Sequence, residues 1–134
     1  MRFEDLEIGM SYEMKRAFSK EEVSQFAALS YDTNPIHLDA EYAKKSMFGR
    51  LIVPGFLTGS LFSAIIGAKF PGEGSVYLNQ TMSFRLPVFI DQTVVATIRV
   101  KELYPEKHRV LLDTQCKDEM GNILIEGEAL VKVP

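Results

Sequence analysis

Residues 54–70 read PGFLTGSLFSAIIGAKF, a stretch with apolar side chains at most positions and no charge before Lys69. A helix that is apolar on all of its faces is buried inside a protein or spans a membrane. At about 16 residues this stretch is shorter than the roughly 20 residues that a membrane span needs. It therefore predicts a central core helix, buried all round, which other elements of the fold wrap.

Four strands are expected after this helix. The segments 75–86, 93–103, 109–117 and 123–133 are rich in β-branched and apolar residues, and turn-forming residues separate them. We expect them to form an antiparallel meander. Apolar and polar residues alternate in the second and third segments, so one face of the sheet must be covered by something apolar. The central helix is the only predicted helix that is apolar enough to cover it.

A strand and two helices are expected before the central helix. Residues 11–18 alternate as a strand does. Ser19, with Glu22 three positions later, forms a capping box, which marks the start of a helix that should end near Tyr31. Turn-forming residues follow, and Asp39 is then placed to cap a short second helix.

These elements predict an α+β fold with one domain over residues 1–134, in which an antiparallel sheet wraps around a buried central helix. A chain of 134 residues suits one hydrophobic core. The predicted sheet has five strands and is open, so its edge strands must be charged, covered or paired with another chain. We therefore expect a homodimer.

The composition disfavours several classes of function. Lysine and arginine number 15 against 18 aspartates and glutamates, and they form no basic stripe, so nucleic acid is not an expected partner. Two histidines and one cysteine provide neither a disulfide framework nor a metal site with ordinary ligand spacing. Because neither a signal peptide nor a membrane span is recognisable, we expect a cytoplasmic protein that does not enter membranes.

The residues richest in chemical information are Asp32, Asn34 and His37. A carboxylate and an imidazole five positions apart, in a turn braced by Pro35, can converge on one point and share one water molecule. Such a pair is suited to general acid–base chemistry. The same pattern is also typical of an ordinary turn that ends a helix, and a single histidine is more often structural than catalytic.

Gly55, at the start of the central helix, is the second candidate. A glycine lets a ligand approach the backbone, and the unpaired amides of a helix N-terminus favour a negatively charged oxygen. The alternative is a glycine that a tight loop needs where it enters a crowded core. Taken with Asp32 and His37, Gly55 completes a base and an oxyanion site, which addition beside a carbonyl requires.

A resemblance to a known family supports this interpretation. Residues 28–39, ALSYDTNPIHLD, resemble the hydratase 2 motif of the MaoC-like enoyl-CoA hydratases, which have the hot-dog fold. The similarity continues through IVPGFLTGSLFS (52–63), YLNQTMSFRLPVF (77–89) and GEALVK (127–132), and so covers nearly the whole chain. It is closest to the short (R)-specific hydratases that supply polyhydroxyalkanoate synthesis, which are single hot-dog domains that form homodimers.

The resemblance implies a hydro-lyase that adds water to a trans-2-enoyl-CoA and gives an (R)-3-hydroxyacyl-CoA, reversibly and without a cofactor. Asp32 and His37 would hold the catalytic water, and the backbone amide of Gly55 would bind the thioester oxygen. Asn34 would brace the loop or orient the pair. Many members of the family have a glycine before the catalytic aspartate, where this chain has Tyr31.

Helical spacing predicts an acyl pocket independently of the family. Gly59, Phe62, Ser63 and Ile66 follow Gly55 by four, seven, eight and eleven positions, so they share its side of the helix. Ser63 is the polar member and either supports the site or bonds back to the carbonyl of Gly59. The bulk of Phe62 and Ile66 predicts a shallow pocket for short to medium acyl chains, although such residues are also typical of a core.

Three alternative functions remain open from the sequence. A 3-hydroxyacyl-[acyl-carrier-protein] dehydratase would need a basic patch at the pocket mouth, which the net charge of −3 does not favour. A hot-dog acyl-CoA thioesterase would place a carboxylate on the central helix, but residues 55–68 contain no aspartate or glutamate. An acyl-CoA-binding module would have no use for Asp32 and His37 together.

Overall fold

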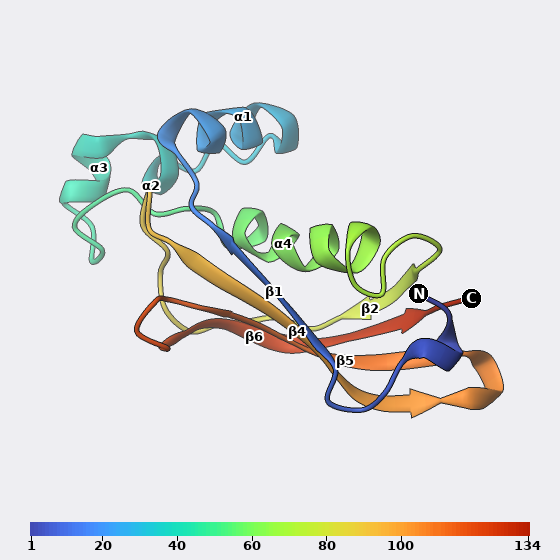
Figure 1. Ribbon diagram of the computed structural model, residues 1–134. Coiled ribbons are helices and arrows are strands. Elements are labelled where there is room, and N and C mark those ends of the chain that lie inside the picture. Colours follow the sequence, from blue (N-terminus) through green and yellow to red (C-terminus); the bar gives the residue numbers. More distant parts are fainter.

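The computed structural model describes residues 1–134, in which one twisted antiparallel sheet lies against the central helix (Figure 1). The strands are β1 (Ser11–Arg16), β2 (Val76–Gln80), β3 (Ser83–Phe84), β4 (Val94–Tyr104), β5 (Arg109–Lys117) and β6 (Ile123–Lys132). The helices are α1 (Lys20–Ser30), α2 (Pro35–Leu38), α3 (Ala40–Lys44) and α4 (Gly55–Ala68), with short 3₁₀ turns at Phe3–Asp5 and Pro105–Lys107. The central helix is α4, as the sequence predicted.

The strand order is β1-β4-β5-β6-β2, and β3 also pairs with β6. The run from β4 through β5 to β6 is the meander that the sequence predicted. The predicted strand at 75–86 was wrong in two respects: it is divided into β2 and β3, and both pair with β6 instead of β4. The reason is that β1 and β5 already occupy the two edges of β4. The sheet consequently has six strands and not five.

The side chains of β4 and β5 alternate between buried and less buried positions, as the sequence pattern predicted. Alternate residues of both strands are buried against α4, and those between them are less buried or exposed. Cys116 belongs to the buried set, and burial raises the pKa of its thiol to about 12, so the thiol stays protonated at neutral pH. It acts as a small apolar core residue.

The sheet covers only one side of α4. Leu61, Phe62, Ile65 and Ile66 of this helix are among its buried residues. On the opposite side Phe56 is 69% exposed, and the small residues at 60, 63, 64 and 67 are exposed as well. The expectation that α4 is buried all round is therefore wrong for the single chain.

No helix of the fold combines the length and the apolarity needed to cross a membrane.

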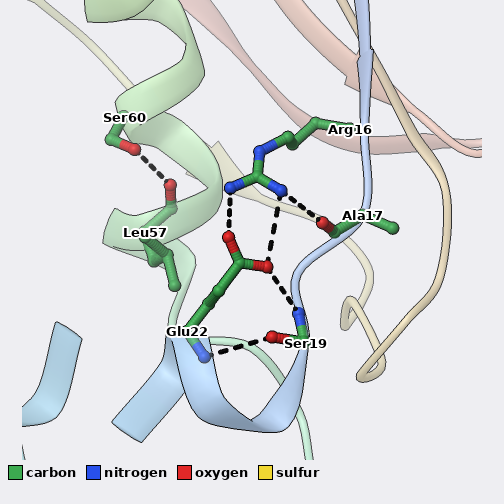
Figure 2. Close-up of polar contacts among 6 residues, drawn as sticks. All are labelled: Arg16, Ala17, Ser19, Glu22, Leu57 and Ser60. Atoms are coloured by element: carbon green, nitrogen blue, oxygen red, sulfur yellow. Dashed lines mark hydrogen bonds and ion pairs between the residues drawn. The ribbon is translucent and has the colours of Figure 1, made fainter. Parts of the chain in front are cut away.

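Helix α1 begins as its capping box predicts. The Ser19 hydroxyl accepts a hydrogen bond from the Glu22 amide at 3.2 Å, and the Glu22 carboxylate accepts one from the Ser19 amide at 3.0 Å. Figure 2 shows that the same carboxylate also forms an ion pair with the guanidinium of Arg16. The Glu22 side chain therefore joins the end of β1 to the start of α1. The strand expected over 11–18 ends at Arg16, and Phe18 is buried in the core just before the cap.

The Glu22 carboxylate should make the stability of the protein depend on pH. Hydrogen bonds from Arg16 and from the Ser19 backbone lower its pKa from 4.5 to about 2 in the folded chain. A lowered pKa contributes stability above the unfolded value, and this contribution is lost as the pH falls from about 4.5 towards 2. We expect Glu22→Gln to have a lower Tm than the wild type at pH 7, and the two Tm values to converge below pH 4.5.

Thermal melts followed by circular dichroism between pH 7 and pH 2 measure this convergence. Glu21→Gln, at the exposed neighbouring carboxylate of the same helical turn, is the control and should follow the wild type. A Tm difference between wild type and Glu22→Gln that stays constant across the whole range would contradict the role given to this carboxylate.

Candidate active site

Asp32 and Asn34 lie in a tight turn between α1 and α2. Tyr31 ends α1 with φ 65° and ψ 13°, a left-handed conformation that reverses the chain. The Asp32 carboxylate accepts a hydrogen bond from the Asn34 amide at 3.3 Å, and the Asn34 side chain accepts one from the Ile36 amide at 3.3 Å. Asn34 is thus the N-cap of α2, and the supporting role that the resemblance gives it stays a prediction.

The short helix α2 was not predicted, because the sequence suggested only an ordered loop between α1 and the next helix. A signal for it was present. An asparagine followed by proline is a favourable start for a helix, since the asparagine caps the first turn and proline at the first position has no amide to leave unpaired. In the structure Asn34 and Pro35 occupy these two positions.

His37 lies in α2 and is only 8% exposed. Its Nδ1 is 2.8 Å from the backbone carbonyl oxygen of Ile52. A carbonyl oxygen can only accept a hydrogen bond, so Nδ1 carries the proton and donates it to this bond. In the neutral ring Nε2 is then an unprotonated acceptor. The contact with Ile52 therefore selects the tautomer in which Nε2 can take a proton.

The two candidate acid–base groups do not contact each other directly. The Asp32 carboxylate accepts from Asn34, the His37 ring donates to Ile52, and no hydrogen bond or ion pair joins the two side chains. Asp32 is half-buried and has a second carboxylate oxygen without a partner in the protein. Each group thus keeps a free acceptor.

Backbone hydrogen bonds hold the segment before α4 against α2. The Ile52 amide donates to the Ile36 carbonyl at 3.3 Å, while the Ile52 carbonyl accepts from His37. The next residue, Val53, donates to the carbonyl of Val88 at 2.7 Å. These bonds tie α2 and the His37 ring to the segment that leads into α4. Neither His37 nor Asp32 is among the residues that line the cavity beside Gly55.

Gly55 is the first residue of α4, and its amide has the character expected of an anion-binding group. The first amides of this helix that find an acceptor are those of Leu57 and Thr58, both bonded to the Pro54 carbonyl. No side chain caps the helix, and its first turn contains no acidic residue. The partial positive charge of the helix N-terminus is therefore not neutralised within the chain.

The structure also supports the alternative reason for a glycine at position 55. A Cβ atom placed there would lie 2.5 Å from Cε1 of the Phe84 ring, which is closer than real contacts allow. Gly55 thus allows Phe84 to pack directly on the backbone of α4. Both explanations, the free amide and the close approach, apply to the same residue.

A cavity of about 350 Å³ borders Gly55. Most of its lining is apolar and includes the aromatic rings of Phe48, Phe56 and Phe84, and the lining also contains Arg85. The Arg85 guanidinium pairs with Glu126 at 3.0 Å. The part that the three rings play in lining a cavity was not expected from the sequence, because they come from separate segments that only the fold brings together.

The predicted acyl-pocket residues are divided between two sides of α4. Phe62 and Ile66 are each 1% exposed and belong to the core, and Gly59 faces Met82. Ser63 lies on the exposed side of the helix. None of the four borders the cavity at Gly55, so their role in holding an acyl chain stays a prediction.

No group of three or more His, Cys, Asp or Glu side chains is placed to hold a metal ion.

Comparison with known proteins agrees with this architecture. The chain is 42% identical to the (R)-specific enoyl-CoA hydratase of Aeromonas caviae over 134 residues, which is the full length of both chains. It is 43% identical over 134 residues to the 3-hydroxybutyryl-CoA dehydratase of Methylorubrum extorquens, covering 98% of this chain and 83% of the relative.

Comparisons with solved structures and with family models agree with these sequence similarities. The (R)-hydratase from A. caviae involved in PHA biosynthesis superposes with a TM-score of 0.94 at 43% identity, covering 96% of this chain and 98% of that one. Its similarity confirms the expected hot-dog fold. Residues 4–119 match the model of the MaoC like domain. The resemblance noted in the sequence is therefore confirmed, and this chain belongs to the MaoC-like domain family.

Proposed function

We propose that this protein is an (R)-specific enoyl-CoA hydratase, which adds water to a trans-2-enoyl-CoA and gives an (R)-3-hydroxyacyl-CoA. The observation that carries the proposal is the orientation of His37, whose Nδ1 is held by the Ile52 carbonyl so that Nε2 is free to accept a proton. The unpaired amide of Gly55 and the free oxygen of Asp32 supply the other two groups that the reaction needs. Similarity to the A. caviae hydratase along the full chain supports the assignment.

The proposed reaction begins with a water molecule between Asp32 and His37. The Asp32 carboxylate accepts one hydrogen of the water and orients it, and Nε2 of His37 takes the other proton as the oxygen bonds to C3. The π electrons of the C2=C3 bond move towards the thioester, whose oxygen becomes negative. The Gly55 amide and the N-terminus of α4 stabilise this charge.

A proton then returns from His37 to C2, which restores the thioester and the neutral imidazole. One O–H bond and one C=C π bond are lost, and one C–O and one C–H bond are formed, so atoms and electrons balance. No oxidant or reductant takes part, and we propose that the enzyme needs no cofactor. The same path in reverse dehydrates the (R)-3-hydroxyacyl-CoA.

The substrate enters as an acyl-CoA of short to medium chain length. We place the part of the substrate next to its thioester in the cavity beside Gly55, where the oxygen can reach the amide. The acyl chain would run along α4 towards Ser63, with Phe62 and Ile66 below it. Because Ser63 is on the exposed side of α4, a second copy of the chain that covers this side would complete the pocket.

The edge strand β2 supports the expected homodimer. Its outer edge is unpaired, its sequence VYLNQ carries no charge, and Val76, Tyr77 and Leu78 are 37–53% exposed. The other edge strand, β1, contains charged residues that discourage pairing. We propose that two copies pair through β2 about a twofold axis.

The single domain over residues 1–134 and the cytoplasmic location expected from the sequence stay predictions.

The first test uses crotonyl-CoA and follows the loss of the conjugated enoyl-thioester absorbance. An (R)-specific 3-hydroxyacyl-CoA reductase assays the product. We expect rapid hydration to the (R) product, and Asp32→Asn and His37→Gln should each lose about 10²- to 10⁴-fold in kcat, the usual contribution of a general acid–base group. The losses in the double variant should not add, because the two side chains act on the same water.

The alternatives give different results in this assay. Release of free thiol without hydration would indicate a thioesterase, and no reaction across several chain lengths would favour a carrier-protein substrate or a binding module. Hydration that persists at near wild-type kcat in Asp32→Asn would show that this pair is not the catalytic one.

A substitution at Gly55 separates its two roles. Gly55→Ala brings a methyl group into the Phe84 ring. Overpacking of this kind costs about 1–3 kcal/mol of stability, and displacement of the amide lowers kcat by up to the 100- to 1000-fold that removal of an oxyanion donor costs. In a double-mutant cycle with Phe84→Ala, the stability loss from Gly55→Ala should shrink, because the ring is gone. Additive stability losses would contradict the clash.

The dimer is tested by placing a charge on the β2 edge. Leu78→Lys should convert the protein from two copies to one in light scattering, because a lysine on an edge strand opposes pairing. Met120→Lys, at an apolar residue 89% exposed in the β5–β6 turn, is the matched control and should leave the dimer intact. A wild type with the mass of one chain would contradict the proposed assembly.

A further inference from the structure

Tyr31 has a backbone conformation that is unfavourable for its residue type. Its φ of 65° and ψ of 13° lie in the left-handed region, which glycine adopts readily, asparagine less so, and bulky residues seldom. The side chain is 89% exposed, so packing of the ring inside the chain does not account for the conformation. Something else must hold the backbone here, directly before Asp32.

Ser30 provides that restraint. Its hydroxyl donates to the Phe26 carbonyl at 2.7 Å, one helical turn back, and accepts from the Asp32 amide at 3.1 Å. One hydroxyl therefore spans Tyr31 and ties the backbone of Asp32 to the last turn of α1. On its other side, Asp32 is held through its carboxylate by the Asn34 amide.

We infer that Ser30 is a positioning residue whose hydroxyl maintains the left-handed turn at Tyr31 and thereby aims the Asp32 carboxylate. This inference rests on the proposed function, in which that carboxylate orients the attacking water. Without the hydroxyl, Tyr31 would relax towards the negative φ that a tyrosine prefers, and the chain direction at Asp32 would change. The Asn34 contact alone does not restrain the backbone before Asp32.

The first experiment compares Ser30→Ala with Ser30→Thr in the crotonyl-CoA assay. A shift of about 1 Å in a catalytic group costs about 100-fold in rate, so Ser30→Ala should lose about 10- to 100-fold in kcat with little change in KM. Threonine keeps a hydroxyl that can bond to the carbonyl one turn back, so Ser30→Thr should retain most of the kcat. Ser24→Ala, at an exposed serine of the same helix, should match the wild type.

The second experiment changes Tyr31 itself and does not depend on the folding of Ser30→Ala. Tyr31→Asn and Tyr31→Val both remove the aromatic ring, but asparagine tolerates the left-handed region and a β-branched valine does not. We expect Tyr31→Asn to keep or raise kcat and Tyr31→Val to lower it. In the Ser30→Ala background, Tyr31→Asn should restore part of the lost kcat. An equal loss in both variants would show that the ring matters and not the backbone, and would overturn the inference.

Asp32→Asn separates failure of this inference from failure of the proposed function. Wild-type kcat in Ser30→Ala together with an inactive Asp32→Asn would overturn the role of Ser30 and leave the proposed hydratase in place. An active Asp32→Asn would overturn the proposed function itself. A raised KM with unchanged kcat in Ser30→Ala would also overturn the inference, because a misaimed water-binding carboxylate slows the chemical step.

Discussion

The hydrogen bond from His37 Nδ1 to the Ile52 carbonyl is the contact on which the proposed site depends. It joins the one-turn helix α2 to the segment that leads into α4, so two parts of the chain that are separate in sequence become one corner of the fold (Figure 1). It also selects the tautomer of the neutral ring, because a carbonyl can only accept. Position and proton-accepting ability of His37 thus have the same physical cause.

Much of the site consists of backbone groups that the fold holds in place. The Ile52 carbonyl selects the tautomer, the Gly55 amide is left unpaired at the start of α4, and the Asn34 amide donates to the Asp32 carboxylate. The sheet and the buried side of α4 form a rigid core behind them. The single chain leaves open the exposed side of α4, with Phe56 and several small residues, and the unpaired edge of β2. This arrangement is consistent with a site that a second copy completes.

The features that the sequence predicted and the structure bears out depend on residues close together in the chain. They are the capping box of α1, the alternation in β4 and β5, and the apolar helix α4. The catalytic role of Asp32 and His37 stays a prediction. Long-range features were not accessible in this way. The pairing of β2 with β6 depends on both edges of β4 being occupied, and the role of Ile52 is that of a carbonyl that any residue carries. The left-handed turn at Tyr31 was also hidden, because its residue type disfavours that conformation.

Nitrogen-15 NMR of the His37 ring, in protein labelled at its two histidines, tests the central claim most directly. A His37→Gln spectrum assigns the signals, and the two ring nitrogens of a neutral imidazole differ clearly in chemical shift according to which one carries the proton. For the neutral ring the account predicts a proton on Nδ1 and none on Nε2. A neutral ring protonated at Nε2 would contradict it, because His37 could then neither donate to the Ile52 carbonyl nor take a proton from water at the site.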